Sequence, residues 1–310
     1  MNKILITGGA GYIGSSLLGT SRPGYITVFD NLYWNQGAFV YPLLRSFPFF
    51  NESVLDWSDK LKREIERADV IIPLAALVGA PLCEKEPDLA QELNYRWFEK
   101  LLGYLDNQLV IYPNTNSGYG STGENICTEE TPTSPISLYG KTKQQTEELL
   151  LNNYDNAIVF RLATVFGWSY RPRMDLLVNN LTMTAYQNKS LEVFDGHFRR
   201  NYIHVKDVAE GFAFAVQNRD RMKGNVYNLG NDSINMTKES LAHIICDVTG
   251  ASYVPVSHRT DPDKRDYIVS SEKLYDLGYK PKIDLRKGIK EILQFCAFDP
   301  AKGEPQLNNY

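Results

Sequence analysis

A glycine-rich turn near the amino terminus constrains the fold of this chain more than any other feature. The run Thr7-Gly8-Gly9-Ala10-Gly11-Tyr12-Ile13-Gly14 follows the apolar segment 4–7 and opens a helical pattern. Its spaced glycines permit a tight turn, close approach of the backbone to a pyrophosphate, and close packing of the helix on a sheet. The amino terminus of a helix also attracts phosphate groups. An ordinary glycine-rich turn is the alternative, but the strand–turn–helix context predicts a dinucleotide-binding turn.

Short apolar runs alternate with helical patterns through the first half of the chain. The runs are rich in β-branched and aromatic residues, as expected of strands that are covered on both faces. They span residues 4–7, 26–29, 70–74, 109–112 and 158–162, and the helical patterns span 59–68, 88–105 and 138–152. Alternating strands and helices predict parallel βαβ units, and therefore an α/β fold with a doubly wound parallel sheet of the Rossmann type.

The pattern changes after about residue 170, where the loops lengthen. Isolated strand candidates follow at 191–194, 226–229 and 252–256. We expect one helix between an N-cap at Thr237 and Gly250, and a last helix over 285–296. The chain is thus predicted to form a dinucleotide-binding domain over 1–170, to which later segments return, and a smaller irregular lobe over 171–310 that mainly binds substrate.

Composition and charge exclude several classes of protein. Of the 310 residues, 43% are hydrophobic and 23% are charged, which excludes disordered and fibrous chains. The formal net charge of -4 argues against a dedicated nucleic-acid-binding protein. The longest apolar stretch, 70–82, contains two prolines and falls short of the ~20 residues that a membrane span needs. Four widely spaced cysteines, and the lack of a signal peptide before Lys3, predict a cytoplasmic protein with reduced thiols.

The second predicted strand ends in an acidic residue, Asp30. A carboxylate at this position accepts hydrogen bonds from both hydroxyls of an adenosine ribose and repels a 2′-phosphate. A solvated aspartate at a strand end is the alternative interpretation. The place of Asp30 behind the glycine turn therefore predicts NAD, rather than NADP, as the cofactor.

A tyrosine and a lysine, Tyr139 and Lys143, stand at the start of the helical pattern 138–152. Positions i and i+4 lie on one face of a helix, so the two side chains project together. An ammonium group favours a nearby phenolate, and we expect Lys143 to lower the pKa of Tyr139. The pair is then suited to act as a general base at neutral pH. The spacing is common by chance, but hydroxyl donors follow a strand just upstream, in the run 112–120.

Two further runs extend these motifs, Arg161-Leu162-Ala163-Thr164-Val165-Phe166-Gly167 and Arg200-Asn201-Tyr202-Ile203-His204-Val205-Lys206-Asp207. With them the chain resembles, over nearly its whole length, the extended short-chain dehydrogenase/reductase family, and in particular the NAD-dependent nucleotide-sugar epimerases and dehydratases. The resemblance implies a Rossmann fold, NAD as cofactor and a nucleotide sugar as substrate. It also implies a homodimer formed by the helices near 88–105 and 138–152.

The resemblance assigns roles to the residues that match the family. Tyr139 would be the catalytic base, Lys143 would bind the nicotinamide ribose, and Thr115 would hydrogen-bond the reacting oxygen of the substrate. The residues implied for the cofactor are Gly8, Gly11, Tyr12, Ile13, Gly14, Asp30, Asn31, Asp56, Leu74, Ala75, Ala76, Asn94, Tyr139 and Lys143. The residues implied for the substrate are Thr115, Thr164, Asn180, Arg200 and Arg265, of which the two arginines would clamp the diphosphate.

This sequence departs from part of the family at the positions that follow Thr115. The 4,6-dehydratases have Asp-Glu there, the acid and the base that eliminate water. Here the two positions are Asn116 and Ser117, neither of which usefully exchanges a proton near pH 7. The departure counts against dehydration and leaves redox chemistry at C4. Thr164 also stands where the family usually has asparagine.

Within the family, the runs 73–83, 114–120, 198–202 and 261–267 are most similar to enzymes that oxidise C4 of a GDP-heptose. This likeness favours a GDP-heptose-type 4-dehydrogenase of capsule polysaccharide biosynthesis. The alternatives are a 4-epimerase of a UDP- or GDP-sugar, an NADPH-dependent ketosugar reductase, which Asp30 disfavours, and a non-catalytic NAD-binding regulator. The four histidines lack metal-ligand spacing, so no metal site is predicted.

Overall fold

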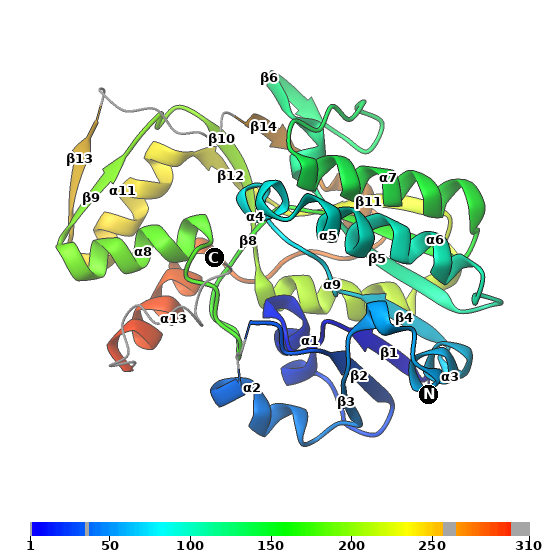
Figure 1. Cartoon of the computed structure of the whole chain (residues 1–310). Helices are drawn as coiled ribbons and strands as arrows, with labels where there is room; N and C mark the ends of the chain where they lie inside the picture. Colours follow the sequence, from blue (N-terminus) through cyan, green and yellow to red (C-terminus); the bar gives the residue numbers. More distant parts are fainter. Residues whose placement is uncertain (1, 35–36, 257–264, 299–310) are drawn as a thin grey trace.

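A seven-stranded parallel sheet forms the centre of the computed structural model, which describes residues 2–34, 37–256 and 265–298 (Figure 1). The strand order is β11-β7-β5-β4-β1-β2-β3, and each neighbouring pair runs parallel. The strands are β1 (Ile4–Thr7), β2 (Ile26–Asp30), β3 (Phe49–Asn51), β4 (Val70–Pro73), β5 (Leu109–Thr115), β7 (Ala157–Leu162) and β11 (Asn225–Leu229). This arrangement confirms the predicted α/β fold with a doubly wound sheet.

Helices cover both faces of the sheet, because successive residues of a strand point to opposite sides. Ile6 belongs to the apolar core under α1 and α9, whereas its neighbour Leu5 belongs to the core under α3, α6 and α7. These helices are α1 (Tyr12–Thr20), α3 (Asp59–Arg67), α6 (Trp97–Leu102), α7 (Leu138–Asn153) and α9 (Val205–Gln217). The short apolar strands of the sequence are therefore buried on both faces, as their composition predicts.

The direction in which strands are added reverses beside β1. β2 and β3 extend the sheet to one side, and β4, β5, β7 and β11 extend it to the other. The connections that follow β1 and β4 thus leave the sheet toward opposite faces. In doubly wound sheets, the crevice at the carboxyl ends of two such strands is where ligands bind.

Two elements of this part differ from the expectations of the sequence. The helix expected over 88–105 is divided into α5 (Pro87–Gln91), a π-helical segment (Glu92–Arg96) and α6. The strand candidate 226–229 is not isolated, because β11 pairs with β7 at the edge of the sheet. Residues after 170 thus contribute α9 and β11 to the sheet side, and the division of the chain at residue 170 stays a prediction.

The later part of the chain forms a smaller lobe, to the left in Figure 1. Its helices α8 (Leu177–Asn188), α11 (Lys238–Thr249) and α13 (Leu285–Phe298) pack around an apolar core of their own. Thr237 caps α11 by accepting from the N–H of Ser240 at 3.1 Å, and Gly250 ends it in the left-handed conformation, as predicted. Short sheets join the parts: β9 (Ser190–Val193) with β13 (Ser252–Pro255), β10 (Arg199–His204) between β8 (Thr164–Phe166) and β12 (Asn231–Thr237), and β6 (Ser121–Cys127) with β14 (Asp266–Val269).

The remaining elements are short. They are α2 (Gly37–Leu44), α4 (Ala80–Lys85), α10 (Arg219–Met222), α12 (Glu272–Tyr275) and the 3-10 turns Val54–Asp56 and Asn116–Tyr119. In the described part of the chain, no helix combines the length and the apolar character that crossing a bilayer requires. All four cysteines are buried as free thiols.

Candidate active site

The glycine turn lies at the end of β1, beside the crevice of the sheet. Gly8 has a φ of +71°, and a Cβ atom there would lie 2.4 Å from the backbone nitrogen of Ala75. Its N–H donates to the carbonyl of Phe29 at 2.7 Å, which ties the turn to β2. Only glycine permits this approach of one backbone to another. The turn therefore leaves a cradle at the amino terminus of α1 that matches the needs of a pyrophosphate.

An open cavity of about 200 Å³ adjoins this turn at the ends of β1, β2 and β4. The predicted cofactor residues that line it are Gly8, Gly11, Asp30, Asn31, Leu74, Ala75 and Ala76. Ile13 and Gly14 lie behind the turn, where a Cβ atom on Gly14 would lie 2.6 Å from the Cα atom of Gly9. The cavity wall also includes Tyr33 and Trp34, whose rings pack edge to face.

Asp30 connects the glycine turn to the end of β2. Its Oδ2 accepts from the N–H of Ala10 at 2.9 Å, and its Oδ1 accepts from the N–H of Leu32 at 2.8 Å. Burial raises the pKa of this carboxyl, although the two N–H donors oppose the shift. The carboxylate lies in the cavity wall, behind the glycine cradle. These two features fit the adenosine ribose and the pyrophosphate of NAD.

Asp56 and Tyr12 are among the predicted cofactor residues that do not line this cavity, and their contacts with the cofactor stay predictions. Asp56 ends a 3-10 turn and is exposed. Ser53 and Val54, which begin this turn, line the cavity in its place. The side chain of Tyr12 is buried and its hydroxyl donates to the carbonyl of Gly167 at 2.7 Å. It therefore joins α1 to the segment after β8.

Asn94 does not line the cavity but hydrogen-bonds to Leu77, which does. It is fully buried in the π-helical segment, where its Oδ1 accepts from the N–H of Leu77 and its Nδ2 donates to the carbonyl of Leu77, each at 2.9 Å. Thr146 of α7 donates to the carbonyl of Asn94 at 2.5 Å. This bond joins the π-helical segment to α7. Asn94 thus fixes the end of the segment 74–77.

The three predicted catalytic residues come from two neighbouring elements. Thr115 is the last residue of β5, and Tyr139 and Lys143 lie one turn apart at the start of α7. Tyr112 of β5 joins the two elements, because its hydroxyl donates to the carbonyl of Lys143 at 3.2 Å. The Nζ atom of Lys143 lies 4.0 Å from the centre of the Tyr112 ring. The fold therefore places the strand end and the helix against each other.

Burial changes the pKa of both helix residues. Lys143 is 3% exposed, and burial lowers its pKa to about 7. Burial raises the pKa of Tyr139 to about 12, and the nearby guanidinium groups of Arg173 and Arg265 only partly oppose this shift. The expectation that Lys143 lowers the pKa of Tyr139 is therefore wrong for this structure. The cost of burying a phenolate outweighs the attraction of the neighbouring cations.

The residues around Thr115 form a tight turn. Its Oγ1 accepts from the N–H of Ser117 at 3.1 Å and donates to the Oγ of Ser117 at 3.0 Å. Asn116 is completely buried, and neither atom of its amide has a hydrogen-bond partner in the described part of the chain. A buried amide without partners is costly. It therefore offers a donor and an acceptor that a polar ligand is able to satisfy.

The two predicted diphosphate clamps lie on neighbouring strands. Arg200 is a buried residue of β10, and Arg265 immediately precedes β14. A bidentate ion pair joins these strands, with the Nε and NH2 of Arg199 at 3.0 and 2.8 Å from the carboxylate of Asp266. The pair brings the backbones that carry Arg200 and Arg265 together. Residues 261–264 of the run quoted above lie outside the described residues.

Thr164 and Asn180 remain predictions as substrate contacts. Thr164 is half-buried at the start of β8. Asn180 is exposed on α8, whereas its neighbour Asn179 is buried and holds a turn together. Asn179 accepts from the N–H of Gly167 at 3.0 Å and donates to the carbonyl of Arg173 at 2.9 Å. Asn179 thus fixes the segment 167–173, which connects β8 to the smaller lobe.

Sequence reasoning missed two buried arginines in that segment, Arg171 and Arg173. The N–H of Arg171 donates to the Oγ of Ser15 at 3.1 Å, so the segment lies along α1. Arg173 pairs with Asp175 and acts electrostatically on Tyr139. The run Arg-Pro-Arg soon after the predicted strand end at Gly167 was the available signal.

Comparison with known proteins places this site in a family. The sequence model of the NAD dependent epimerase/dehydratase family matches residues 4–230. The chain belongs to this family. The dependence of the family on NAD confirms the predicted cofactor.

The relatives include more than one activity. The chain is 28% identical to a UDP-glucose 4-epimerase of Halalkalibacterium halodurans, over 90% of each protein. It is 24% identical to a dTDP-D-glucose 4,6-dehydratase of Mus musculus, over 94% of this chain and 88% of the relative. The family membership therefore supports a nucleotide-sugar enzyme, and the relatives include both epimerases and dehydratases. They also include the methionine adenosyltransferase 2 subunit beta of Rattus norvegicus, which is 27% identical over 94% of this chain and 87% of the relative.

Solved structures share the fold. The dTDP-glucose 4,6-dehydratase of Bacillus anthracis in complex with NAD has a TM-score of 0.82 at 24% identity, covering 99% of this chain and 100% of that one. The UDP-glucuronic acid 4-epimerase of Bacillus cereus, in complex with UDP-glucuronic acid and NAD, has a TM-score of 0.80 at 23% identity. That match covers 94% of this chain and 99% of the epimerase.

Proposed function

We propose that this chain uses NAD to oxidise C4 of a nucleotide-diphosphate sugar. The observation that supports the proposal is the packing of β5, which ends at Thr115, against the helix that carries Tyr139 and Lys143, in a chain of an NAD-dependent family. A phenol, an ammonium and a hydroxyl in this arrangement are suited to remove a proton from a sugar hydroxyl. The competing function is a non-catalytic NAD-binding regulator, which would not need all three groups.

In the proposed reaction, Tyr139 accepts the proton of the C4 hydroxyl. Thr115 hydrogen-bonds the same oxygen, and Lys143 binds the nicotinamide ribose. When bound, NAD supplies the hydride acceptor. Because the pKa of Tyr139 is about 12 in this structure, we infer that bound cofactor and substrate lower it before the phenolate serves near neutral pH.

The first test is the variant Tyr139→Phe, which removes the proton acceptor and little volume. We expect turnover to fall by about 10²–10⁴-fold, the usual contribution of a general base. NAD affinity should stay near that of the wild type, since the phenolic oxygen is not needed to hold the cofactor. Turnover by product analysis and calorimetric NAD titration measure the two effects. A wild-type kcat in the variant would contradict the role of Tyr139, and no turnover by the wild type with any nucleotide sugar would favour the regulator.

We propose in addition that the product keeps every oxygen of the substrate. The support is Asn116 and Ser117, which stand where elimination of water needs an acid and a base, whereas relatives of this chain include 4,6-dehydratases. Mass spectrometry of the product should show either the loss of two hydrogens, for a C4 ketone, or an unchanged mass, for an epimer. A product lighter by one water would overturn this part of the proposal.

The sequence likeness to GDP-heptose enzymes favours release of the ketone, and thus a GDP-heptose-type 4-dehydrogenase of capsule polysaccharide biosynthesis. A 4-epimerase is the second candidate, favoured by the 28% identity to a UDP-glucose 4-epimerase. A screen of UDP-, GDP- and dTDP-sugars separates the two. NADH accumulates if the ketone leaves, whereas a stable epimer forms without NADH. We propose on the same likeness a homodimer, which sedimentation would test.

A further inference from the structure

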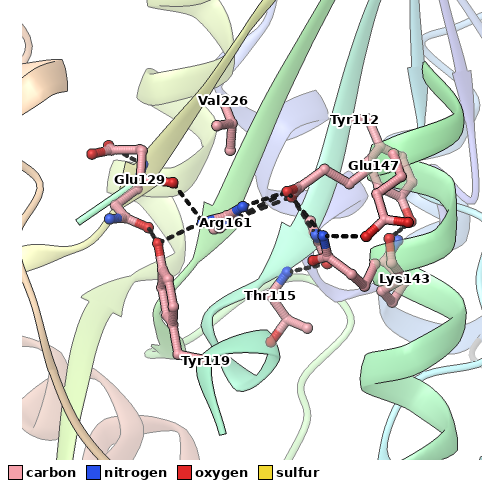
Figure 2. Close-up of polar contacts among 12 residues, drawn as sticks. Tyr112, Thr115, Tyr119, Glu129, Lys143, Glu147, Arg161 and Val226 are labelled. Carbon is pink, nitrogen blue, oxygen red and sulfur yellow. Dashed lines mark hydrogen bonds and ion pairs between the residues drawn. The ribbon is translucent and has the colours of Figure 1, made fainter. Parts of the chain in front are cut away.

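A buried amide links the end of β5 to the catalytic helix. Asn114 is 3% exposed and directly precedes Thr115. Its Oδ1 accepts from the N–H of Thr115 at 2.8 Å, and its Nδ2 donates to Oε2 of Glu147 at 2.5 Å (Figure 2). One side chain thus uses its acceptor on the strand and its donor on α7. Among neutral side chains of this size, an amide supplies both.

Glu147 lies on the same face of α7 as the proposed catalytic residues. It follows Lys143 by four positions and Tyr139 by eight, and residues at such spacing line one side of a helix. The bond from Asn114 therefore reaches the row of side chains that carries Tyr139 and Lys143. Asn114 thus joins the backbone of Thr115 to this row, two residues along β5 from the bond between Tyr112 and the carbonyl of Lys143.

The carboxylate of Glu147 is in turn held by an arginine of the sheet. The Nε of Arg161, on β7, lies 3.2 and 3.1 Å from its two oxygens, and NH2 lies 2.5 Å from Oε1. Both residues are buried, at 2% exposure for Glu147 and 6% for Arg161. Arg161 also donates to the hydroxyl of Tyr119 at 2.9 Å, as Figure 2 shows. A buried, paired carboxylate held in this way is a rigid acceptor for Asn114.

The hydroxyl of Thr115 depends on the backbone that Asn114 fixes. It bonds to the N–H and the Oγ of Ser117, so its direction follows from the local turn. A rotation of the strand end would move this hydroxyl relative to Tyr139 and Lys143. Small displacements of reacting groups cost large factors in rate.

We propose that Asn114 is a positioning residue, which sets the Thr115 hydroxyl relative to Tyr139 and Lys143 through its bridge to Glu147. The inference rests on the proposed C4 oxidation. It assigns to Asn114 no contact with the substrate or the cofactor. Its effect should therefore fall on kcat and leave binding unchanged.

The test compares Asn114→Ala with Asn228→Ala. Asn228 is also fully buried, and it accepts from the hydroxyl of Tyr119 at 2.7 Å, at the far end of the same hydrogen-bonded group. We expect Asn114→Ala to lower kcat by about 10- to 100-fold, the scale of a misplaced reacting group, with little change in KM or NAD affinity. Asn228→Ala should lower Tm without a comparable loss of kcat. An unchanged kcat in Asn114→Ala, or an equal loss in both variants, would overturn the inference.

A rescue experiment keeps the inference testable if Asn114→Ala folds poorly. Asn114→Asp places two carboxylates against each other and should lose more activity than Asn114→Ala. When Glu147→Gln is added, position 147 donates and position 114 accepts, the reverse of the wild-type bond. The double variant should therefore recover most of the kcat lost by Asn114→Asp. A double variant no faster than Asn114→Asp would count against the bridge. Failure of the proposed function is distinguishable, because the wild type itself would then not turn over a nucleotide sugar.

Discussion

At the residue scale, the lowered pKa of Lys143 and its proposed contact with the cofactor predict that NAD binding depends on pH. Burial lowers this pKa to about 7, so the ammonium loses its proton as the pH rises above that value. A charged donor forms hydrogen bonds about twice as strong as a neutral one. We expect the Kd for NAD to be constant below about pH 6 and to increase from about pH 7 to pH 9. Titration calorimetry measures this profile, and Lys143→Met should bind weakly at every pH. A flat wild-type profile would count against a charged contact.

Asp30 should decide between the two nicotinamide cofactors. Its carboxylate lies in the cavity wall, where it would face a 2′-phosphate of NADP. We expect NAD to bind more tightly than NADP, and Asp30→Ala to weaken NAD binding and narrow the difference. Asp30→Asn is the closest control for shape, because it removes the charge and keeps one oxygen acceptor where Asp30 uses two, one for the N–H of Ala10 and one for that of Leu32. Equal affinities of the wild type for NAD and NADP would contradict this role of Asp30.

Single residues were predictable where chemistry requires one residue type at one place. Gly8 is such a position, because its positive φ and its contact with Ala75 admit no side chain. The place of Asp56 was not predictable, because the sequence does not show that the chain turns at Ser53, three residues earlier. The role of Asn114 was not predictable either. Its partner Glu147 lies 33 residues away, and only the packing of α7 on β5 brings the two together.

At the scale of elements, one carboxylate joins the last helix to the sheet side. Glu291 of α13 lies 3.3 Å from Nε2 of His204 and 3.0 Å from Nζ of Lys206, where α9 begins. Burial alone would raise the pKa of Glu291, but these two partners hold it at about 2. The folded value lies below the ordinary 4.5, so the carboxylate stabilises the fold above that pH and loses its effect as the pH falls toward 2.

The variant Glu291→Gln tests this contribution. We expect it to lower Tm at neutral pH, and the difference from the wild type should shrink below about pH 4.5. Thermal unfolding followed by circular dichroism measures both values. The control is Glu210→Gln, which breaks an exposed pair with Lys282 and should change Tm little. A difference in Tm that does not depend on pH would show that Glu291 acts by packing alone.

Elements with a strong periodic pattern were predicted well, and those defined by a distant partner were not. The helix from Thr237 to Gly250 has its cap, its apolar face and its glycine stop within one segment. The expected helix over 88–105 contains instead a π-helical segment, stabilised by Thr146 from another helix. Likewise, the segment 226–229 gives no local sign that it pairs with β7, because that pairing depends on the return of the chain to the sheet.

At the scale of the whole molecule, the residues proposed for the two ligands come from different parts of the chain. The glycine turn and Asp30 belong to the sheet, whereas Arg200 and Arg265 come from strands β10 and β14 or their approach. Guanidinium groups match the geometry of phosphates and bind them by charge-assisted hydrogen bonds. The two arginines should therefore determine the affinity for the nucleotide sugar and leave that for NAD unchanged.

The variants Arg200→Ala and Arg265→Ala test whether the two arginines bind the nucleotide sugar and not NAD. Each charge-assisted contact contributes about 1.5–3 kcal/mol, so we expect KM for the nucleotide sugar to rise by about 10- to 100-fold in each variant, with NAD affinity preserved. The control is Arg286→Ala, because Arg286 pairs with Asp247 at an exposed position and should leave KM unchanged. Steady-state kinetics measures KM, and calorimetry measures NAD binding. If both variants kept the wild-type KM, the diphosphate would bind elsewhere, and if both lost NAD affinity instead, these arginines would serve the cofactor.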